Sequence, residues 1–558
     1  MKTKKIVLLL LLLIQFTLFA QVFNRVETFG GSSDDEIYAV AIDSQGNVYT
    51  TGIFHDTVDF DSGAGVTQLT SAGTEDIFIK KTDANGQLLW VKQIGGANSD
   101  GAIILKIDAN DNLYLSGWFS NSVDFDPGAN TYNLTSNGLW DTFVLKLDSN
   151  GDFIWAKSYG NTSLDLVSDF ELDNYGNIYL TGTFKNTVDF DPSSNVYNLI
   201  SNGAWDAYVL KLDNNGDFVW AQNFGSSSYD KGRSVTIDDM GNIYLTGQFK
   251  QTVDFNFGPN INELTAVANY DGFILKLTGD GSFIWVKQLG GDDTTDPLSI
   301  AVDNQQNIFI SGKFKGTVDF DPGQGSNNIT ADDQYDMFIL KLNDTGNLNW
   351  VHTLSGPEDI FGTNISTVND KIYSSGFFEG NALLSWSNGF LNFTSAGEKD
   401  GIFVIMNQNG DVINTKQIGG TGNDVAYKVK VNNQKIYIIG SFENNVNIDA
   451  GTNTSITSNG EKDAFLLVLD ENNNGMDTGL ITKINIYPNP AQDGRFTIDT
   501  GDLSGVDIRI LDMSGRIIYT RNNVKGVFPL QLDLKQGIYL IECRREHQKT
   551  VFKLNEIH

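Results

Sequence analysis

Cysteine is nearly absent from this chain of 558 residues, because Cys543 is the only one. A single cysteine excludes an internal disulfide framework and a cysteine-based metal cluster. Histidine occurs four times, and the two in the repeated region, His55 and His352, have no His or Cys beside them. A His-rich catalytic metal site is therefore not expected. The sequence also contains no Gly-x-Ser-x-Gly elbow, phosphate loop or HExxH motif.

Basic residues are few as well. The chain has 38 Lys and Arg against 69 Asp and Glu, which gives a net charge of −31. This balance argues against binding to DNA or RNA, because nothing in it can neutralise a run of phosphates. It equally disfavours docking to an anionic membrane surface. Hydrophobic residues make up 40% of the chain, so a large core is possible and the chain is not a disordered one.

The longest apolar run lies at the N-terminus. Lys2, Lys4 and Lys5 precede the run Ile6–Ile14, and Ala20 offers a small residue for cleavage. The run is too short to span a bilayer as a helix, so residues 1–20 are predicted to be a secretory signal peptide, with a mature chain that begins near Gln21. An N-terminal membrane anchor is the alternative.

A phrase ending in Gly-x-Phe recurs seven times at intervals of 64 or 65 residues. Its glycines are Gly52, Gly117, Gly182, Gly247, Gly312, Gly376 and Gly440. Two further markers keep nearly the same period: an aspartate (Asp76, Asp141, Asp206, Asp271, Asp336, Asp400 and Asp463) and a tryptophan (Trp90, Trp155, Trp220, Trp285 and Trp350). Three markers locked to one period establish an internal repeat.

Each repeat reads as four β-branched and aromatic strands separated by Gly, Asn and Asp turns, without a helical apolar period. One four-stranded antiparallel sheet per repeat predicts an all-β, seven-bladed β-propeller over residues 21–474. The seventh unit stops after its third strand at Asp470, and the N-terminal FNRVETFGG matches the fourth-strand phrase LLWVKQIGG. We therefore expect the N-terminal strand to complete the last blade and close the ring. An open solenoid of sheets is the structural alternative.

The recurrent DxxGN-I-Y-L-x-G phrase resembles the SBBP and NHL types of bacterial β-propeller repeat over roughly residues 22–474. The resemblance implies that the four strands of a blade run from a central channel outwards. The first strand, such as RSVTID (233–238), would then line the channel.

The C-terminal segment differs in pattern. A Gly/Asn-rich linker, residues 475–482, precedes about six short strands in residues 483–558, which predicts a small β-sandwich. The segment resembles the type A C-terminal sorting domain of the type IX secretion system of Bacteroidota. The matching residues include Tyr487, Pro488, Asn489, Pro490, Gly515, Gly537 and Tyr539. The resemblance implies export across the outer membrane, the translocon as a partner, and a secreted or surface-attached product. A carbohydrate-binding sandwich is the alternative.

Paired carboxylates recur between the second and third strands. The pairs are Asp59 with Asp61, Asp124 with Asp126, Asp189 with Asp191, and Asp319 with Asp321. Alternate residues of a strand point to one side, so each pair is a candidate Ca²⁺ site with oxygen ligands. The competing interpretation is turn chemistry, in which Asp accepts backbone N–H bonds. Asp35, Asp100, Asp165, Asp230 and Asp424 recur in the loops between blades and leave the same two readings open.

The function that these features favour is a non-enzymatic binding or adhesion module, with a glycan or a surface protein as ligand and no certain cofactor. The irregular sixth unit, with Trp386 and Phe390, is where we expect an asymmetric site. An extracellular polysaccharide hydrolase or lyase, which needs only two carboxylates, is one alternative. A structural surface or matrix component is the other, because propellers host all three.

Overall fold

The computed structural model describes residues 22–387, 389–449, 454–471, 485–492, 494–500, 505–512, 516–535, 537–545 and 548–557. The predicted signal peptide (1–20), the predicted linker (475–482) and Gly515 lie outside these residues. Within them every regular element is a β-strand, which confirms the all-β prediction. No helix in this described part is long and apolar enough to cross a membrane.

The first four repeats fold alike, each as one antiparallel sheet of four long strands. The strands are β2 (Glu36–Ile42), β3 (Val48–Phe54), β6 (Asp76–Thr82) and β7 (Leu88–Ile94) in blade 1; β8 (Gly101–Ile107), β9 (Leu113–Phe119), β12 (Asp141–Leu147) and β13 (Phe153–Tyr159) in blade 2; β14 (Leu166–Leu172), β15 (Ile178–Phe184), β18 (Asp206–Leu212) and β19 (Phe218–Phe224) in blade 3; and β20 (Lys231–Ile237), β21 (Ile243–Phe249), β24 (Asp271–Leu277) and β25 (Phe283–Gly291) in blade 4.

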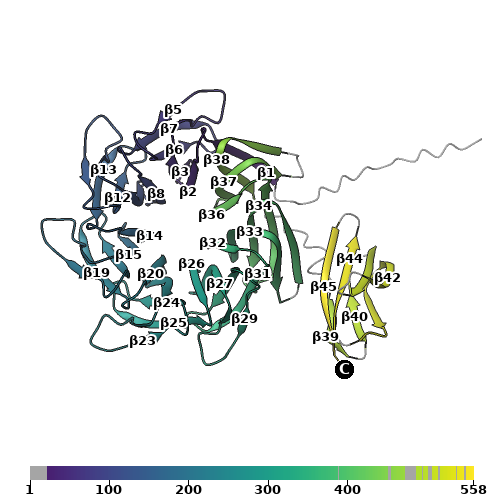
Figure 1. The fold of residues 1–558 in the computed structure, drawn as a ribbon. Coiled ribbons are helices and arrows are strands. Elements are labelled where there is room, and N and C mark those ends of the chain that lie inside the picture. The colour runs from purple at the N-terminus through teal and green to yellow at the C-terminus, as the bar shows by residue number, and fades with distance from the viewer. Residues whose placement is uncertain are drawn as a thin grey trace, which may run out of the picture.

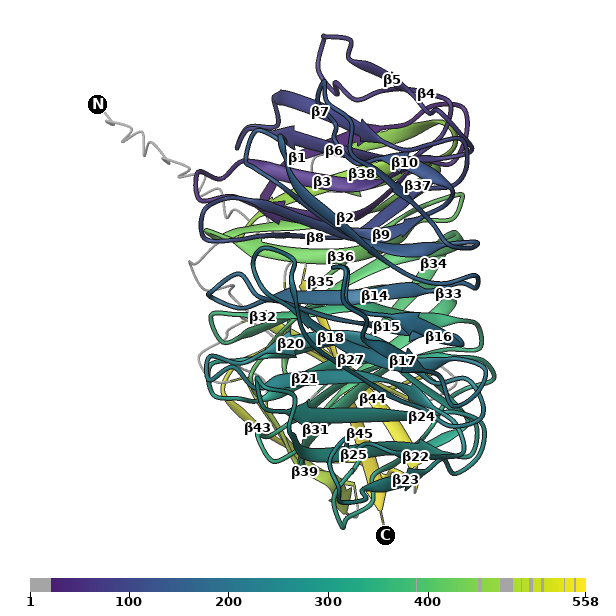
Figure 2. The same cartoon turned by 90° about the vertical axis from the view of Figure 1, so that its left-hand side faces the viewer.

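A short hairpin is inserted between the second and third long strands of blades 1 to 5. The hairpins are β4 (Thr57–Asp59) with β5 (Gln68–Thr70), β10 (Ser122–Asp124) with β11 (Asn133–Thr135), β16 (Thr187–Asp189) with β17 (Asn198–Ile200), β22 (Thr252–Asp254) with β23 (Glu263–Thr265), and β28 (Thr317–Asp319) with β29 (Asn328–Thr330). Strands β4, β10, β16 and β22 lie on one side of the ring, at the right of Figure 2.

The last three blades complete the arrangement, and hydrogen bonds between neighbouring blades join them into one 12-stranded sheet. Blade 5 holds β26 (Thr294–Val302), β27 (Ile308–Lys315), β30 (Asp336–Leu342) and β31 (Leu348–Ser355); blade 6 holds β32 (Ile360–Val368), β33 (Lys371–Trp386), β34 (Gly389–Asn407) and β35 (Val412–Gly420); blade 7 holds β36 (Val425–Asn432), β37 (Lys435–Asp449), β38 (Thr454–Asp470) and β1 (Val22–Phe29). Strand β1 pairs antiparallel with β38, from Val22 opposite Asp470 to Phe29 opposite Ala464. The N-terminal strand is thus the fourth strand of the last sheet, and the first strands of the sheets face the centre (Figure 1).

The repeated tryptophan packs between blades. A Cβ on Gly216, in the hairpin turn between the third and fourth strands of blade 3, would come within 2.9 Å of the Trp155 ring of blade 2. Gly216 also has a φ of 76°, which L side chains rarely adopt. The glycine is therefore needed for the turn and for the close approach of the indole.

Buried aspartates connect neighbouring blades. Asp100 accepts the N–H of Gly96 (2.8 Å) at the end of blade 1 and the N–H of Ser120 (2.9 Å) after the second strand of blade 2. Four further aspartates make the same pair of contacts: Asp35, Asp165, Asp230 and Asp424. We call these five residues the clamp aspartates. Blades 5 and 6 carry Thr295 and Ile360 in this position. The turn-chemistry interpretation of these five residues is confirmed.

The aspartate that opens each third strand holds the preceding loop. Asp141, for example, accepts the N–H of Asn137 at 2.9 Å. A glycine lies directly against the carboxylate, because a Cβ on Gly160 would come within 2.3 Å of it. This contact explains the first glycine of the repeated Gly-Gly phrase, such as Gly95-Gly96.

The described residues of the C-terminal domain form seven strands rather than about six: β39 (Asn485–Gln492), β40 (Arg495–Asp499), β41 (Val506–Asp512), β42 (Ile517–Val524), β43 (Val527–Gln531), β44 (Gly537–Arg545) and β45 (Gln548–Ile557). Two antiparallel groups, β42-β41-β44-β45 and β39-β40-β43, are joined by a short parallel pairing of β39 with β45. Phe496 and Ile498 of one group share a buried core with Ile510 and Cys543 of the other. Burial raises the pKa of Cys543 to about 12, so this residue fills core space and is no nucleophile.

Burial makes stability depend on pH. It raises the pKa of Asp100, Asp141 and Asp165 to about 6, with a contribution from the charge of Asp165 at Asp141. A carboxyl whose pKa is higher in the folded state stabilises it fully below the unfolded pKa, and this contribution disappears as the pH rises through about 6. We therefore expect the melting temperature of the full chain to rise as the pH is lowered from about 8 to about 5. Differential scanning fluorimetry measures it, and Asp141→Asn should flatten the slope. A melting temperature that stays constant over this interval would contradict the assignment.

The junction between blades 7 and 1 carries a buried charge cluster. Lys80 of β6, with a side chain 2% exposed, has its Nζ 3.4 Å from Oε2 of Glu27 in β1. Arg25 Nε lies 3.0 Å from the other oxygen of Glu27. The positions that correspond to Lys80 in blades 2 to 5 are leucines: Leu145, Leu210, Leu275 and Leu340.

Removing one partner of this cluster leaves a buried charge without compensation. We expect Glu27→Ala to lower the free energy of unfolding by about 3–5 kcal/mol. In the double variant Glu27→Leu/Lys80→Leu, position 80 carries the leucine of blades 2 to 5. This variant should regain most of the lost free energy of unfolding. Urea unfolding of the full chain measures both. A loss below about 1 kcal/mol for the single variant would rule out a stabilising role for the cluster.

Candidate functional site: the central channel

A central cavity of about 680 Å³ is lined by the first strands of the blades, which are β2, β8, β14, β20, β26, β32 and β36. Successive residues of a strand point to opposite sides, so each first strand turns one residue into its blade and its neighbours toward the cavity. The residues that each first strand turns into its own blade are apolar and buried: Val40, Leu105, Phe170, Val235, Ile300, Ile365 and Val429. The residues before and after them form two rings. We call Ala39, Ile104, Asp169, Ser234, Ser299, Asn364 and Lys428 the relay ring, and Ala41, Lys106, Glu171, Thr236, Ala301, Ser366 and Lys430 the charged ring.

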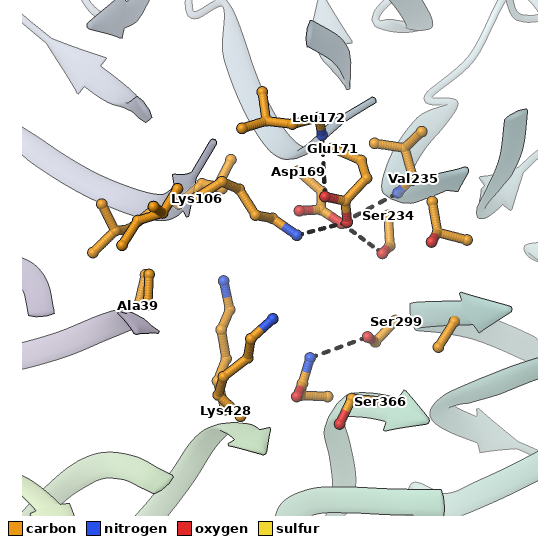
Figure 3. A pocket seen from close by; sticks show the side chains of 18 of the residues that line it. Ala39, Lys106, Asp169, Glu171, Leu172, Ser234, Val235, Ser299, Ser366 and Lys428 are labelled. Atoms are coloured by element: carbon orange, nitrogen blue, oxygen red, sulfur yellow. Dashed lines mark hydrogen bonds and ion pairs between the residues drawn. The ribbon is translucent and has the colours of Figure 1, made fainter. Parts of the chain in front are cut away.

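Side chains of the relay ring bond each blade to the next. Asp169 Oδ2 accepts the N–H of Val235 (3.2 Å) and the hydroxyl of Ser234 (2.7 Å). The same contact repeats along the ring. Ser234 Oγ accepts the N–H of Ile300 (3.3 Å), Ser299 Oγ accepts the N–H of Ile365 (3.1 Å), and Asn364 Oδ1 accepts the N–H of Val429 (3.1 Å). Figure 3 shows the two bonds of Asp169, to the hydroxyl of Ser234 and to the N–H of Val235. The polar groups of this ring therefore serve the scaffold from blade 3 to blade 7.

The relay ends at Lys428, which has no acceptor to offer. Its Nζ instead donates to the carbonyl oxygen of Ile103, on blade 2, at 3.1 Å. Blade 1 lies between these two blades and contributes only Ala39 and Ala41 to the rings. The two small side chains leave the space that the lysine crosses.

The charged ring is asymmetric. Lys106 Nζ lies 2.8 Å from Glu171 Oε2. Burial alone would raise the pKa of Glu171, but the charge and hydrogen bond of Lys106 outweigh burial and lower it. Lys430 is exposed toward the cavity, yet burial and the charge of Lys106 lower its pKa, against the opposing effect of Glu171. Among the described residues, neither Lys430 nor Lys428 forms an ion pair with a carboxylate.

Ser366, the charged-ring residue of blade 6, has a buried Oγ without a hydrogen-bond partner in the described structure. It follows Ile365 on β32, so it belongs to the same ring as Lys430 of the neighbouring blade 7. The charged ring thus holds one complete ion pair and, beside it, an ammonium and a hydroxyl that the scaffold does not use.

The sequence pattern pointed to the first strands as the channel wall but not to a site there. The signal was present, because Lys106, Glu171, Ser366 and Lys430 occupy a position that is alanine in blades 1 and 5. This variation is hidden when only the features common to all repeats are compared.

The paired aspartates lie at the inserted hairpins, away from this cavity. Asp59 Oδ1 accepts the N–H groups of Asp61 (3.1 Å) and Thr67 (2.8 Å), and Asp61 Oδ1 accepts the N–H of Gly63 (2.8 Å). The first aspartates of the other pairs accept two N–H groups in the same way: Asp124, Asp189 and Asp319. The second aspartates each accept one N–H from two residues further on: Asp126 from Gly128 (2.8 Å), Asp191 from Ser193 (2.9 Å) and Asp321 from Gly323 (2.9 Å).

Asp126 and Asp321, two of the predicted calcium ligands, accept N–H groups of their own hairpin loops. Within the described residues, no group of three or more His, Cys, Asp or Glu that could hold a metal ion includes any of the eight predicted ligands, which are Asp59, Asp61, Asp124, Asp126, Asp189, Asp191, Asp319 and Asp321. The physical reason is that a tight loop after a strand leaves backbone donors that the nearest carboxylate satisfies. The bonds are therefore turn chemistry, and calcium at the pairs stays a prediction.

The irregular blade 6 does not present Trp386 to a ligand. In this blade the insert is absorbed into the long strands β33 and β34, and Trp386 is 9% exposed within the hydrophobic core. His352 is also buried, stacks on Trp350 with ring centroids 4.7 Å apart, and has its pKa lowered to about 4 by burial. Neither residue is available for catalysis or stacking.

The residues of the sorting motif lie on two strands of the C-terminal domain. Tyr487, Pro488, Asn489 and Pro490 belong to β39, and Gly537 and Tyr539 begin β44. The hydroxyl of Tyr539 donates to the carbonyl oxygen of Lys535 at 2.8 Å, which fixes the turn before β44.

Comparison with protein families identifies both parts of the chain. Residues 485–555 match the secretion system C-terminal sorting domain. Residues 219–248 and 284–313 match the SBBP β-propeller repeat, each from the fourth strand of one blade to the second strand of the next. The sorting domain directs export through the type IX secretion system to the cell surface or the extracellular space.

Two curated proteins share part of the sequence. An uncharacterized WD repeat-containing protein of Acanthamoeba polyphaga mimivirus is 24% identical over 487 residues, covering 72% of this chain and 35% of its own length. The regulatory protein FlaEY of Caulobacter vibrioides is 24% identical over 174 residues, covering 30% of this chain and 17% of its own length. The chain thus spans about a third or less of the relatives that it matches.

Solved structures give weak likenesses. Drosophila semaphorin 2a is 7% identical with a TM-score of 0.37 (96% of this chain, 98% of that chain), and the phage phi92 endosialidase is 11% identical with a TM-score of 0.33 (95% and 87%). PorZ, a surface component of the type-IX secretion system of Porphyromonas gingivalis, is 11% identical with a TM-score of 0.14 (97% and 100%). All three scores are below 0.5 and carry no argument about function. The family matches and the fold together make this chain an all-β propeller protein with SBBP repeats, followed by a type IX secretion sorting domain.

Proposed function

We propose that this protein is a non-enzymatic binding module, delivered to the cell exterior by its sorting domain, and that it takes its ligand in the central channel. The observation that carries the proposal is the asymmetry of the charged ring. The other repeated polar residues serve the scaffold in blade after blade, whereas Lys430 and Ser366 occur once each and are left unused. Ligand pockets characteristically combine a concave site with a few convergent polar groups.

The carboxylates of the cavity argue against hydrolysis. A glycosidase needs one carboxyl with a raised pKa as general acid. Lys106 lowers the pKa of Glu171, and Asp169 is held by Ser234 and the backbone N–H of Val235. Glu171 is therefore not suited to donate a proton at neutral pH, which favours the binding role over the polysaccharide hydrolase or lyase.

Blocking the channel tests the proposal. The full chain is applied to a glycan panel, and binding is compared with that of Ala301→Trp, which places an indole among the charged ring without changing its charge. We expect a loss of affinity of about tenfold or more, because the indole occupies the ligand's space. Met240→Trp, at a turn residue that is 66% exposed, is the matched control and should bind as the natural chain does. Ligands that bind Ala301→Trp unchanged would place the site elsewhere.

Calcium is tested separately, by melting the full chain in calcium and in EDTA. A ligand that binds only the folded state raises its stability by mass action. Because Asp59 and Asp61 already accept backbone N–H bonds, we expect no difference in melting temperature between the two conditions. A calcium-dependent rise that is lost in Asp59→Asn/Asp61→Asn would instead establish the paired aspartates as cation sites.

A further inference from the structure

We propose that the charged ring binds a single anionic group, a carboxylate or a sulfate, between Lys430 and Ser366. This inference rests on the channel being the binding site, as proposed above, and adds the chemical class of the ligand. The geometry that supports it is the placement of two uncommitted donors, an ammonium and a hydroxyl, on neighbouring blades of one ring around a cavity of about 680 Å³.

The charge balance of the cavity points the same way. Its lining carries five cations, Lys106, Lys146, Arg233, Lys428 and Lys430, and four anions, Asp108, Asp169, Glu171 and Asp173. Lys106 pairs with Glu171, Lys146 with Asp108 and Arg233 with Asp296, whereas Asp169 accepts hydrogen bonds from Ser234 and Val235. Among the described residues Lys430 is left without a carboxylate partner and is exposed toward the cavity, where an anion can pair with it.

The position of each donor agrees with the hydrogen bonds of the neighbouring ring. Lys428 spans the channel to Ile103 and is therefore already engaged on the side of blade 2. Asn364, directly before Ile365, gives its amide to Ser299 and its carbonyl to Val429 N–H. Lys430 has no carboxylate partner among the described residues, and the buried Oγ of Ser366 has no hydrogen-bond partner there, so we assign these two donors of blades 6 and 7 to the oxyanion.

The experiment measures the melting temperature of the full chain at constant ionic strength with sodium glucuronate, sodium sulfate or glucose. We expect both anions to raise it and glucose to leave it unchanged. In Lys430→Met the affinity for glucuronate should fall by about tenfold or more, and in Ser366→Ala by a smaller factor, because a charge-assisted hydrogen bond is the stronger of the two. Lys525→Met, which removes an exposed lysine of the C-terminal domain, is the matched charge control and should respond as the natural chain does.

A second readout needs no ligand. Lys430→Met should melt at a higher temperature than the natural chain in chloride alone, because it removes an unpaired ammonium beside Lys106. A merely structural lysine would give the opposite sign.

The outcomes separate this inference from the proposed function. The anion site is overturned if glucose raises the melting temperature as much as glucuronate does. It is also overturned if the melting temperature of Lys430→Met responds to the anions as that of the natural chain does. If glycan binding is lost in Ala301→Trp but unchanged in Lys430→Met, the channel is confirmed as the binding site and the anion site is rejected. If glycans bind Ala301→Trp normally while Lys430→Met loses the sulfate response, the anion site is confirmed and the proposed glycan-binding role of the channel is rejected. If sulfate binds as tightly as glucuronate, a free anion is sufficient as the ligand. If glucuronate binds more tightly, the site recognises the sugar acid.

Discussion

The structure depends on how a carboxylate in a loop between two blades satisfies backbone N–H groups from both of them. Each clamp aspartate accepts one N–H from the end of a fourth strand and one from the end of the next blade's second strand. Buried backbone donors need a partner, and a carboxylate that accepts two of them fixes both segments at once. The clamps therefore set the spacing of neighbouring blades at the face of the ring where they lie.

Because the clamps and the relay ring hold the blades together, the charged ring is free to vary. Its members need only be compatible with the blade behind them, whose packing is supplied by the adjacent apolar residue, such as Val429 beside Lys430. This division between a repeated scaffold and a variable lining is how a symmetric fold acquires one asymmetric site. It also explains why the cavity can hold several lysines while the chain as a whole is acidic.

Sequence reasoning reached the all-β class and the blade strands because these follow from local patterns that recur, and it reached the sorting domain through motifs that resemble a known family. Asp141 illustrates the first case, since its period marks it as part of the repeat. The channel site was not reached, because it depends on which residues the ring brings face to face. Lys428 and Ile103 are 325 positions apart, and no periodicity predicts their contact. The strand pattern predicted that the paired aspartates point to one side. Asp59 accepts N–H groups of its own hairpin, and a cation at the pairs stays a prediction.

The pairing of β1 with β38 joins residues that are more than four hundred positions apart, as Val22 and Asp470 are. The entropy of closing so long a loop must be overcome before that pairing yields any stabilisation, so the last sheet is expected to form late during folding. Until it forms, β38 presents an unpaired edge to which another chain can add a strand. The buried pair of Glu27 and Lys80 makes that edge selective for the strand that pairs with it. The fourth strands of blades 1, 2, 4 and 6 would bring Lys92, Lys157, Lys287 or Lys416 to the position of Glu27 and set two positive charges against each other, whereas those of blades 3 and 5 would bring Gln222 or His352. The closing charge pair therefore selects the chain's own first strand over the fourth strands that carry a lysine there.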